Sequence, residues 1–120
     1  MKPKDPKYIN VPNICFSLTK ESDSRDIEFA KQRKKLGFDD SETWSLGDTI
    51  ALFIIPRLKR YIDIAPNAPV EPFDSDCKEF LTALELFSRD NGARIYTKEE
   101  QDLIDVGFSK FGSIIWGLWW

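Results

Sequence analysis

The 120-residue sequence predicts an all-α fold, a compact four-helix domain with a kinked central helix and an extended N-terminal arm. Three observations lead to this prediction. Apolar residues recur at three- and four-residue spacing in four segments, polar capping residues precede several of these segments, and alternating strand-like patterns are almost absent. The length indicates one domain, for which we expect an arm over residues 1–21 and a helical domain over residues 22–120.

The arm carries lysines, prolines and one short apolar stretch, Ile14 to Leu18. Because Pro12 argues against a central strand, we expect the arm to pack on the helices. The first helix is predicted in "SDSRDIEFAKQRKKLG", which starts with capping residues and ends at Gly37. Its apolar stripe is narrow, which favours a surface helix. We interpret "KQRKK" (31–35) as a solvated basic face, with a binding site as the alternative.

The second helix is predicted to begin at Ser45, which with Asp48 forms the pattern of a capping box. Apolar residues surround it nearly completely as far as Pro56. We therefore predict that residues 46–63 form the central helix, buried on most sides before the proline, with Phe53 in the core. A proline inside a helix removes one backbone hydrogen bond, and this predicts the kink.

Three prolines in residues 63–74 predict an extended connector. A third helix is expected from about residue 75 to residue 91, with its inward face formed by Phe80, Leu81, Leu84 and Phe87. Thr97 and Glu100 predict a second capping box. The fourth helix is then expected to continue toward the chain end, carrying the apolar residues Leu103, Ile104, Phe108, Phe111, Ile114, Ile115 and Leu118.

Composition excludes several classes of function. The net charge of −3 argues against a protein that binds extended nucleic acid. There is no histidine, and Cys15 and Cys77 are too few for a metal cluster, so we expect buried reduced thiols, no metal and no cofactor. No apolar run is long enough to span a membrane, and the N-terminus lacks the apolar centre of a signal peptide, so we expect a cytoplasmic protein.

Clustered carboxylates do not change this expectation. They lie at predicted helix starts, where the helix dipole favours anions, which gives a structural reason for Asp39, Asp40, Glu42, Glu99, Glu100 and Asp102. We therefore do not expect an enzyme.

The segment "WSLGDTIALFIIPRLKRY", from Trp44 to Tyr61, is the most specific motif. It resembles a family of small, mostly uncharacterised phage proteins that carry W-S-L, two residues, T-I-A, one residue, and then F/Y-I-L-P-R-L-K-R-F/Y. The resemblance implies a helical fold and a viral origin, and hence the host cytoplasm as the location. It does not imply a reaction.

The residues after Pro56 form a candidate ligand site. Arg57, Arg60 and Tyr61 are spaced to share one helix face, and Lys59 projects to another side. Two guanidinium groups can hold a phosphate, while Tyr61 or Trp44 stacks on a base. The alternative is that the arginines pair with acidic neighbours and the two aromatic residues complete the core.

The C-terminus "SIIWGLWW" places Trp116, Trp119 and Trp120 within five residues. Soluble monomers rarely leave such a patch in water, so we predict a homo-oligomer interface there. Packing into the core and anchoring at a membrane interface are the alternatives.

Together these patterns predict a non-catalytic binding protein for a small phosphorylated ligand. With the phage resemblance, the sharpest form of this hypothesis is a sponge that sequesters a cyclic-nucleotide immune signal of the host. The alternative is a phage protein that binds, and inhibits or recruits, a host protein through aromatic and charged surface. Sequestration requires no nucleophile, base or metal, which suits a chain without histidine.

Overall fold

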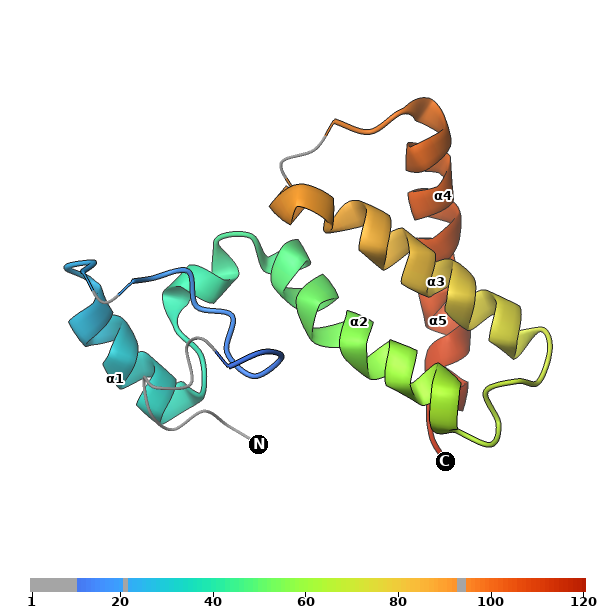
Figure 1. Ribbon diagram of the computed structural model, residues 1–120, viewed down its shortest axis with the longest axis horizontal. Coiled ribbons are helices and arrows are strands. Elements are labelled where there is room, and N and C mark those ends of the chain that lie inside the picture. The colour runs from blue at the N-terminus through green and yellow to red at the C-terminus, as the bar shows by residue number, and fades with distance from the viewer. Residues whose placement is uncertain (1–10, 21, 93–94) are drawn as a thin grey trace. The chain divides into compact units, whose positions relative to one another are not determined.

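The computed structural model describes residues 11–20, 22–92 and 95–120, and within them the fold is all-α, as predicted (Figure 1). Residues 1–10 and 21 of the expected arm lie outside this part. The chain divides into two compact units, residues 1–53 and 54–120. The helices are α1 (Asp26–Leu36), α2 (Leu46–Ile64), α3 (Phe73–Phe87), α4 (Lys98–Ser109) and α5 (Phe111–Ile114), with 3-10 turns η2 (Asp40–Thr43), η3 (Arg89–Gly92) and η4 (Ile115–Gly117).

The first unit contains α1, η2 and the first half of α2. Helix α1 begins four residues later than the expected Ser22, and it ends at Gly37, whose φ of 86° is left-handed. This confirms the predicted C-cap, because glycine adopts that conformation without strain. Residues 15–20 form neither helix nor strand. Their backbone is bound instead by side chains of the η2 region, as when Phe16 N–H donates to Glu42.

Helix α2 continues on both sides of Pro56, close to the predicted limits. The prediction that it is buried on most sides before the proline, with Phe53 in the core, is wrong. Ala51 and Leu58 are buried, but Phe53 is 49% exposed, and Leu46, Ile50 and Leu52 are exposed to a similar extent. An apolar helix surface is buried only where another element covers it, and much of the surface of α2 before Pro56 is not covered in this way.

The core of the second unit lies where α3 packs against α4 and α5, whose ribbons it crosses in Figure 1. Helix α4 approaches α3 at Gly107, where a side chain would overlap Ala83 and the carbonyl of Glu79. The predicted capping box of Thr97 and Glu100 is confirmed at the start of α4. Buried side chains of this unit include Cys77, Phe80, Ala83, Leu84, Ile104 and Ile114.

The last predicted helix does not continue to the chain end. Helix α4 stops at Ser109, and α5 and η4 follow it as short pieces. Lys110 N–H bonds the carbonyl of Gly107, three residues earlier, which tightens the turn between α4 and α5. The third helix likewise ends earlier than predicted, at Phe87, and residues 89–92 form a separate turn.

Candidate functional site

The second half of α2 carries four of the predicted ligand residues. Arg57 and Arg60 are exposed. Tyr61 is half-buried, and its hydroxyl is directed at the carbonyl oxygens of Gly117 (2.8 Å) and Trp119 (3.2 Å). Lys59 forms an exposed ion pair with Glu85 at 3.2 Å. The hydroxyl of Tyr61 is therefore already engaged in holding the C-terminal segment.

Trp44, the remaining predicted ligand residue, belongs to the first unit and is 51% exposed. The edge of its ring meets Phe29, with ring centroids 6.0 Å apart. The guanidinium of Arg25 lies 4.8 Å from the Trp44 ring centroid, a cation–π contact. The same guanidinium donates a hydrogen bond to Asp23, and hydrogen bonds from Arg25 lower the pKa of the Asp23 carboxyl to about 2. Within the first unit, Trp44 thus packs on side chains of the same unit.

The C-terminal tryptophans are exposed although their backbone is held in place. Trp116 is 84% exposed, Trp119 69% and Trp120 68%. The carbonyl of Gly117 accepts hydrogen bonds from Tyr61 and from the side-chain amide of Asn67, both at 2.8 Å. A side chain at position 117 would also meet the ring of Phe73. We call the three exposed indoles the tryptophan surface; they do not pack into the core of the second unit.

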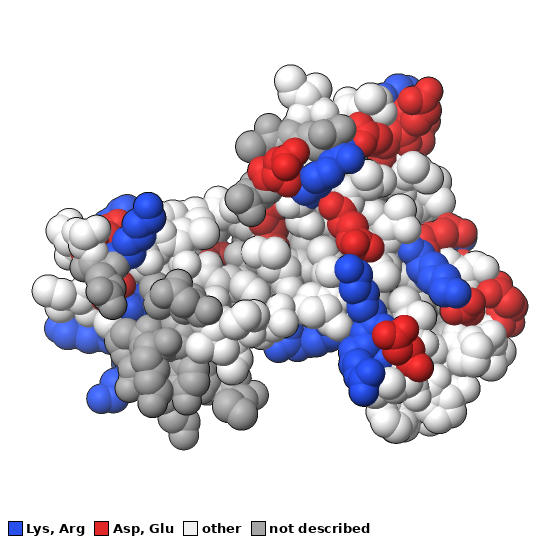
Figure 2. Space-filling view, in the orientation of Figure 1, with Lys and Arg blue, Asp and Glu red and all other residues white. Residues whose placement is uncertain are grey.

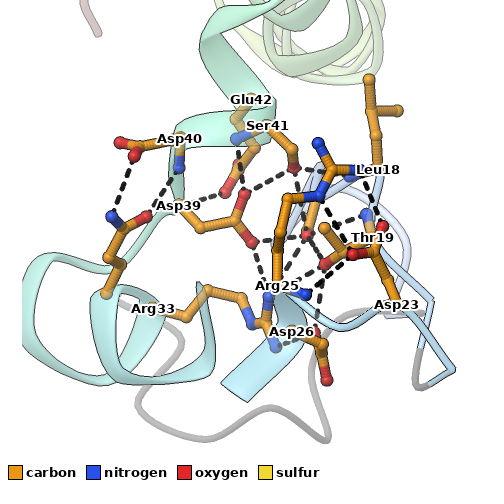
Figure 3. Close-up of polar contacts among 12 residues, drawn as sticks. Leu18, Thr19, Asp23, Arg25, Asp26, Arg33, Asp39, Asp40, Ser41 and Glu42 are labelled. Carbon is orange, nitrogen blue, oxygen red and sulfur yellow. Dashed lines mark hydrogen bonds and ion pairs between the residues drawn. The ribbon is translucent and has the colours of Figure 1, made fainter. Parts of the chain in front are cut away.

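A polar cluster that the sequence analysis did not predict occupies the interior of the first unit (Figure 3). Arg33, expected on a solvated face with the rest of "KQRKK", is fully buried. Its guanidinium pairs with Asp39 at 2.5 Å and with Asp26 at 2.9 Å. The hydroxyls of Ser17 and Ser41 also donate to the Asp39 carboxylate.

The electrostatics of this polar cluster are those of a structural element. Burial opposes ionisation of Asp39, but hydrogen bonds from Ser17, Ser41 and Arg33 outweigh it and lower the pKa of the carboxyl. Burial raises the pKa of Glu42, whose two oxygens accept the backbone N–H groups of Phe16 and Asp39. Because these carboxylates are buried and hydrogen-bonded, they are poorly placed to exchange protons with a substrate.

Both cysteines are free and buried. Burial raises the pKa of the Cys77 thiol to about 11, and it raises the pKa of Cys15 as well. A thiol that remains protonated at neutral pH is a poor nucleophile. The expectation of buried thiols that act as small apolar side chains is confirmed.

A groove of about 770 Å³ lies along α3 and α4 and was not predicted from the sequence. Its lining combines apolar side chains of α4 with acidic side chains of both helices and one lysine of α3. Acidic groups gather at the α4 end of the face drawn in Figure 2. We call this feature the α3/α4 groove; it is lined by Lys78, Glu79, Thr82, Glu99, Asp102, Leu103 and Val106.

Comparisons with known proteins add no family or function: no protein-family model, curated protein or solved structure matches the chain. Among the described residues, no group of three or more cysteine, aspartate or glutamate side chains is arranged to hold a metal ion. Within the same ranges, no helix has the length and apolar character needed to cross a membrane.

Proposed function

We propose that this protein is a non-catalytic binding protein that engages a protein partner through the tryptophan surface. The observation that carries the proposal is the combination of three exposed indoles with a fixed backbone at Gly117. Tryptophan supplies large apolar area at protein interfaces and is enriched among the residues that dominate binding energy. A backbone held in place before binding lowers the entropy lost on association.

The resemblance of residues 44–61 to phage proteins supports a host protein as the partner and the host cytoplasm as the location. Arg57 and Arg60 add exposed positive charge on α2, directly beside the tyrosine that tethers the C-terminal segment. A suitable partner would have apolar pockets that accept the indoles and acidic side chains at the edge of the interface that face Arg57 and Arg60.

A second candidate is the capture of a small phosphorylated ligand, such as a cyclic nucleotide, by Arg57 and Arg60. The observation that favours it is their exposure one helical turn apart on α2. Two guanidinium groups at this spacing can share one phosphodiester. Tyr61 would contribute its ring, since its hydroxyl is bonded to the C-terminal segment.

The protein-binding proposal is tested with a variant that replaces Trp116, Trp119 and Trp120 by alanine. Partners retained from host lysate by the natural chain are purified and titrated against both proteins. We expect the tryptophan variant to lose about 2–4 kcal/mol of binding free energy, which is typical of a central interface residue. This loss weakens binding by roughly 30- to 1000-fold. The control replaces the exposed apolar residues Val70 and Ile95 by alanine and should bind as the natural chain does. Equal affinity of the tryptophan variant for every purified partner contradicts the proposal.

Self-association through the same surface, the use predicted from the sequence, is separated by sedimentation equilibrium. Deleting Trp119 and Trp120 lowers the solution mass if the partner is a second copy. A mass that the deletion leaves unchanged, together with weakened binding of a host protein, assigns the surface to that foreign partner.

The ligand candidate is tested by calorimetric titration with cyclic di- and trinucleotides. Removing one charge-assisted hydrogen bond, at about 1.5–3 kcal/mol, makes Arg57→Ala bind roughly ten- to a hundredfold more weakly. Arg57→Lys restores only part of the affinity, because an ammonium group cannot reproduce the planar fork of a guanidinium. Nucleotide binding that survives in both Arg57→Ala and Arg60→Ala excludes this site.

A further inference from the structure

The lining of the α3/α4 groove combines apolar side chains with three carboxylates. Leu103 and Val106 line it and are 52% and 50% exposed. Glu79, Glu99 and Asp102 line it as well and add negative charge. A partner that binds this groove favourably would present apolar side chains to Leu103 and Val106 and positive charge to the carboxylates.

The lysines near the groove leave this acidic character in place. Lys78 pairs with Asp74 and Lys98 pairs with Asp102, each one helical turn apart, and Lys110 lies 3.8 Å from Glu79; every one of these pairs is at least partly exposed. Such pairs are weak in water, so they can rearrange at little cost when a partner arrives. Each of the two helices also contains three more acidic than basic residues.

Helix α1 of the first unit presents the complementary surface. Ile27 is 75% exposed, and Lys31, Lys34 and Lys35 are exposed on the same helix. The spacing of these four residues places them on one face, which we call the basic α1 face. The opposite face is held in the interior by Phe29 and Arg33.

We propose that the basic α1 face of one copy of this chain docks in the α3/α4 groove of a second copy. The order of side chains along the two helices supports this pairing. Along α4 the acidic positions 99 and 102 come before the apolar positions 103 and 106, whereas along α1 the apolar position 27 comes before the basic positions 31 and 34. An antiparallel approach therefore matches Ile27 with the apolar lining residues of α4 and the lysines with the carboxylates.

The lengths of the two surfaces agree as well. Seven residue steps separate positions 27 and 34 on α1, and seven separate positions 99 and 106 on α4. At 1.5 Å per residue, each stretch extends about 10.5 Å. Both ends of the basic α1 face can thus meet their counterparts in one register.

This contact joins different surfaces of the two copies, because α1 lies in the first unit and the groove in the second. Contacts of that kind lead to closed rings or to open chains. The association is favoured at low ionic strength, since the Debye length falls from about 30 Å at 0.01 M salt to about 3 Å at 1 M. It does not require the tryptophan surface.

Charge reversal tests the proposal by sedimentation equilibrium at low salt. The α1 variant is Lys31→Glu/Lys34→Glu and the groove variant is Glu99→Lys/Asp102→Lys. Each creates like charges across the contact, and we expect each to weaken self-association by roughly tenfold or more. A single chain with all four substitutions should associate again, because the two surfaces then carry opposite charges once more, with their signs exchanged.

The control Asp63→Lys/Asp105→Lys makes the same charge change as the groove variant at exposed residues that do not line the groove, and should associate as the natural chain does. Circular dichroism of each variant checks that the helices are retained. A natural chain that is monomeric at every concentration, or a fourfold variant that remains dissociated, overturns the proposal. Self-association that disappears when Trp119 and Trp120 are deleted, and ignores the charge reversals, assigns the contact to the tryptophan surface instead.

Discussion

Arg33 carries a positive charge in the interior of the first unit, where Asp39 and Asp26 neutralise it. The planar guanidinium suits this position, because it donates in several directions while remaining charged. Its neighbour Lys34 points to solvent, although both belong to the same run of basic residues. One helical step therefore separates a buried structural charge from an exposed one.

Replacing Arg33 tests the role of this charge. Arg33→Met leaves Asp39 buried without its cationic partner, and we expect the free energy of unfolding to fall by about 3–5 kcal/mol. The matched control Lys34→Met alters an exposed position and should stay within about 0.5 kcal/mol of the natural chain. Urea denaturation followed by circular dichroism measures both. Similar stability of the two variants would mean that Arg33 is not needed in the interior.

Asp39 also predicts how stability responds to acid. Its carboxyl pKa is lower in the folded chain than the value of about 3.9 expected when unfolded. As the pH falls, the unfolded chain takes up this proton first, so the stabilisation is complete well above about pH 4 and is lost as the pH falls through the folded pKa. Thermal melts from pH 6 downward should show a smaller acid-dependent loss for Asp39→Asn, from a lower starting stability. An unchanged acid-dependent loss would contradict this assignment.

At the scale of elements, capping residues predicted individual helix ends better than apolar patterns predicted which helix surfaces are buried. Gly37 and the pair Thr97 and Glu100 act within one turn of backbone, and the structure has both. The break at Lys110 was missed, because the apolar spacing continues through it and no proline or capping residue marks it. The segments 17–19 and 39–41 contain short polar side chains, and this was a sequence signal for the polar cluster. The hydrogen bonds between the two segments, however, depend on the tertiary fold.

The contact between α3 and α4 gives a prediction at the same scale. Gly107→Ala places a methyl group against Ala83 and the Glu79 carbonyl, and a rigid backbone atom cannot move aside easily. We expect a loss of about 1–3 kcal/mol or more in the free energy of unfolding. Gly112→Ala is the control, since no atom lies near its added side chain and alanine favours helix by about 0.5–1 kcal/mol. Denaturant titration of the two variants should therefore show opposite shifts, and equal shifts would contradict the close approach.

For the whole molecule, the sequence predicted the fold class and the inward positions of Phe80 and Leu84, but it overestimated the burial of α2. Hydrophobicity around α2 indicates that the helix could be buried, whereas burial depends on which elements cover it. Other elements do cover Phe80 and Leu84 of α3 and Ile104 of α4, and these side chains are buried. The role of Tyr61 could not be predicted for the same reason. Its hydroxyl donates a hydrogen bond to the carbonyl of Gly117, which is 56 residues away in the sequence.

Two phenylalanines test this distribution of the core. Phe80 is 5% exposed, so Phe80→Ala should lower the free energy of unfolding by about 3–5 kcal/mol. Phe53 is 49% exposed, and the cost of Phe53→Ala should be roughly half of that or less, because much of its surface already meets water. Denaturant titrations of both variants decide the matter. A larger loss at Phe53 than at Phe80 would return the core to α2.

The two buried thiols make the chain convenient for site-specific chemistry. With both thiols buried and their pKa values raised, maleimide reagents should leave Cys15 and Cys77 unmodified while the chain is folded. A cysteine introduced at an exposed position such as Ser113 would then take up a fluorophore selectively, without removal of the natural cysteines. Labels placed on separate preparations would report energy transfer between copies, so the association of identical chains could be followed in real time at concentrations far below those that sedimentation requires.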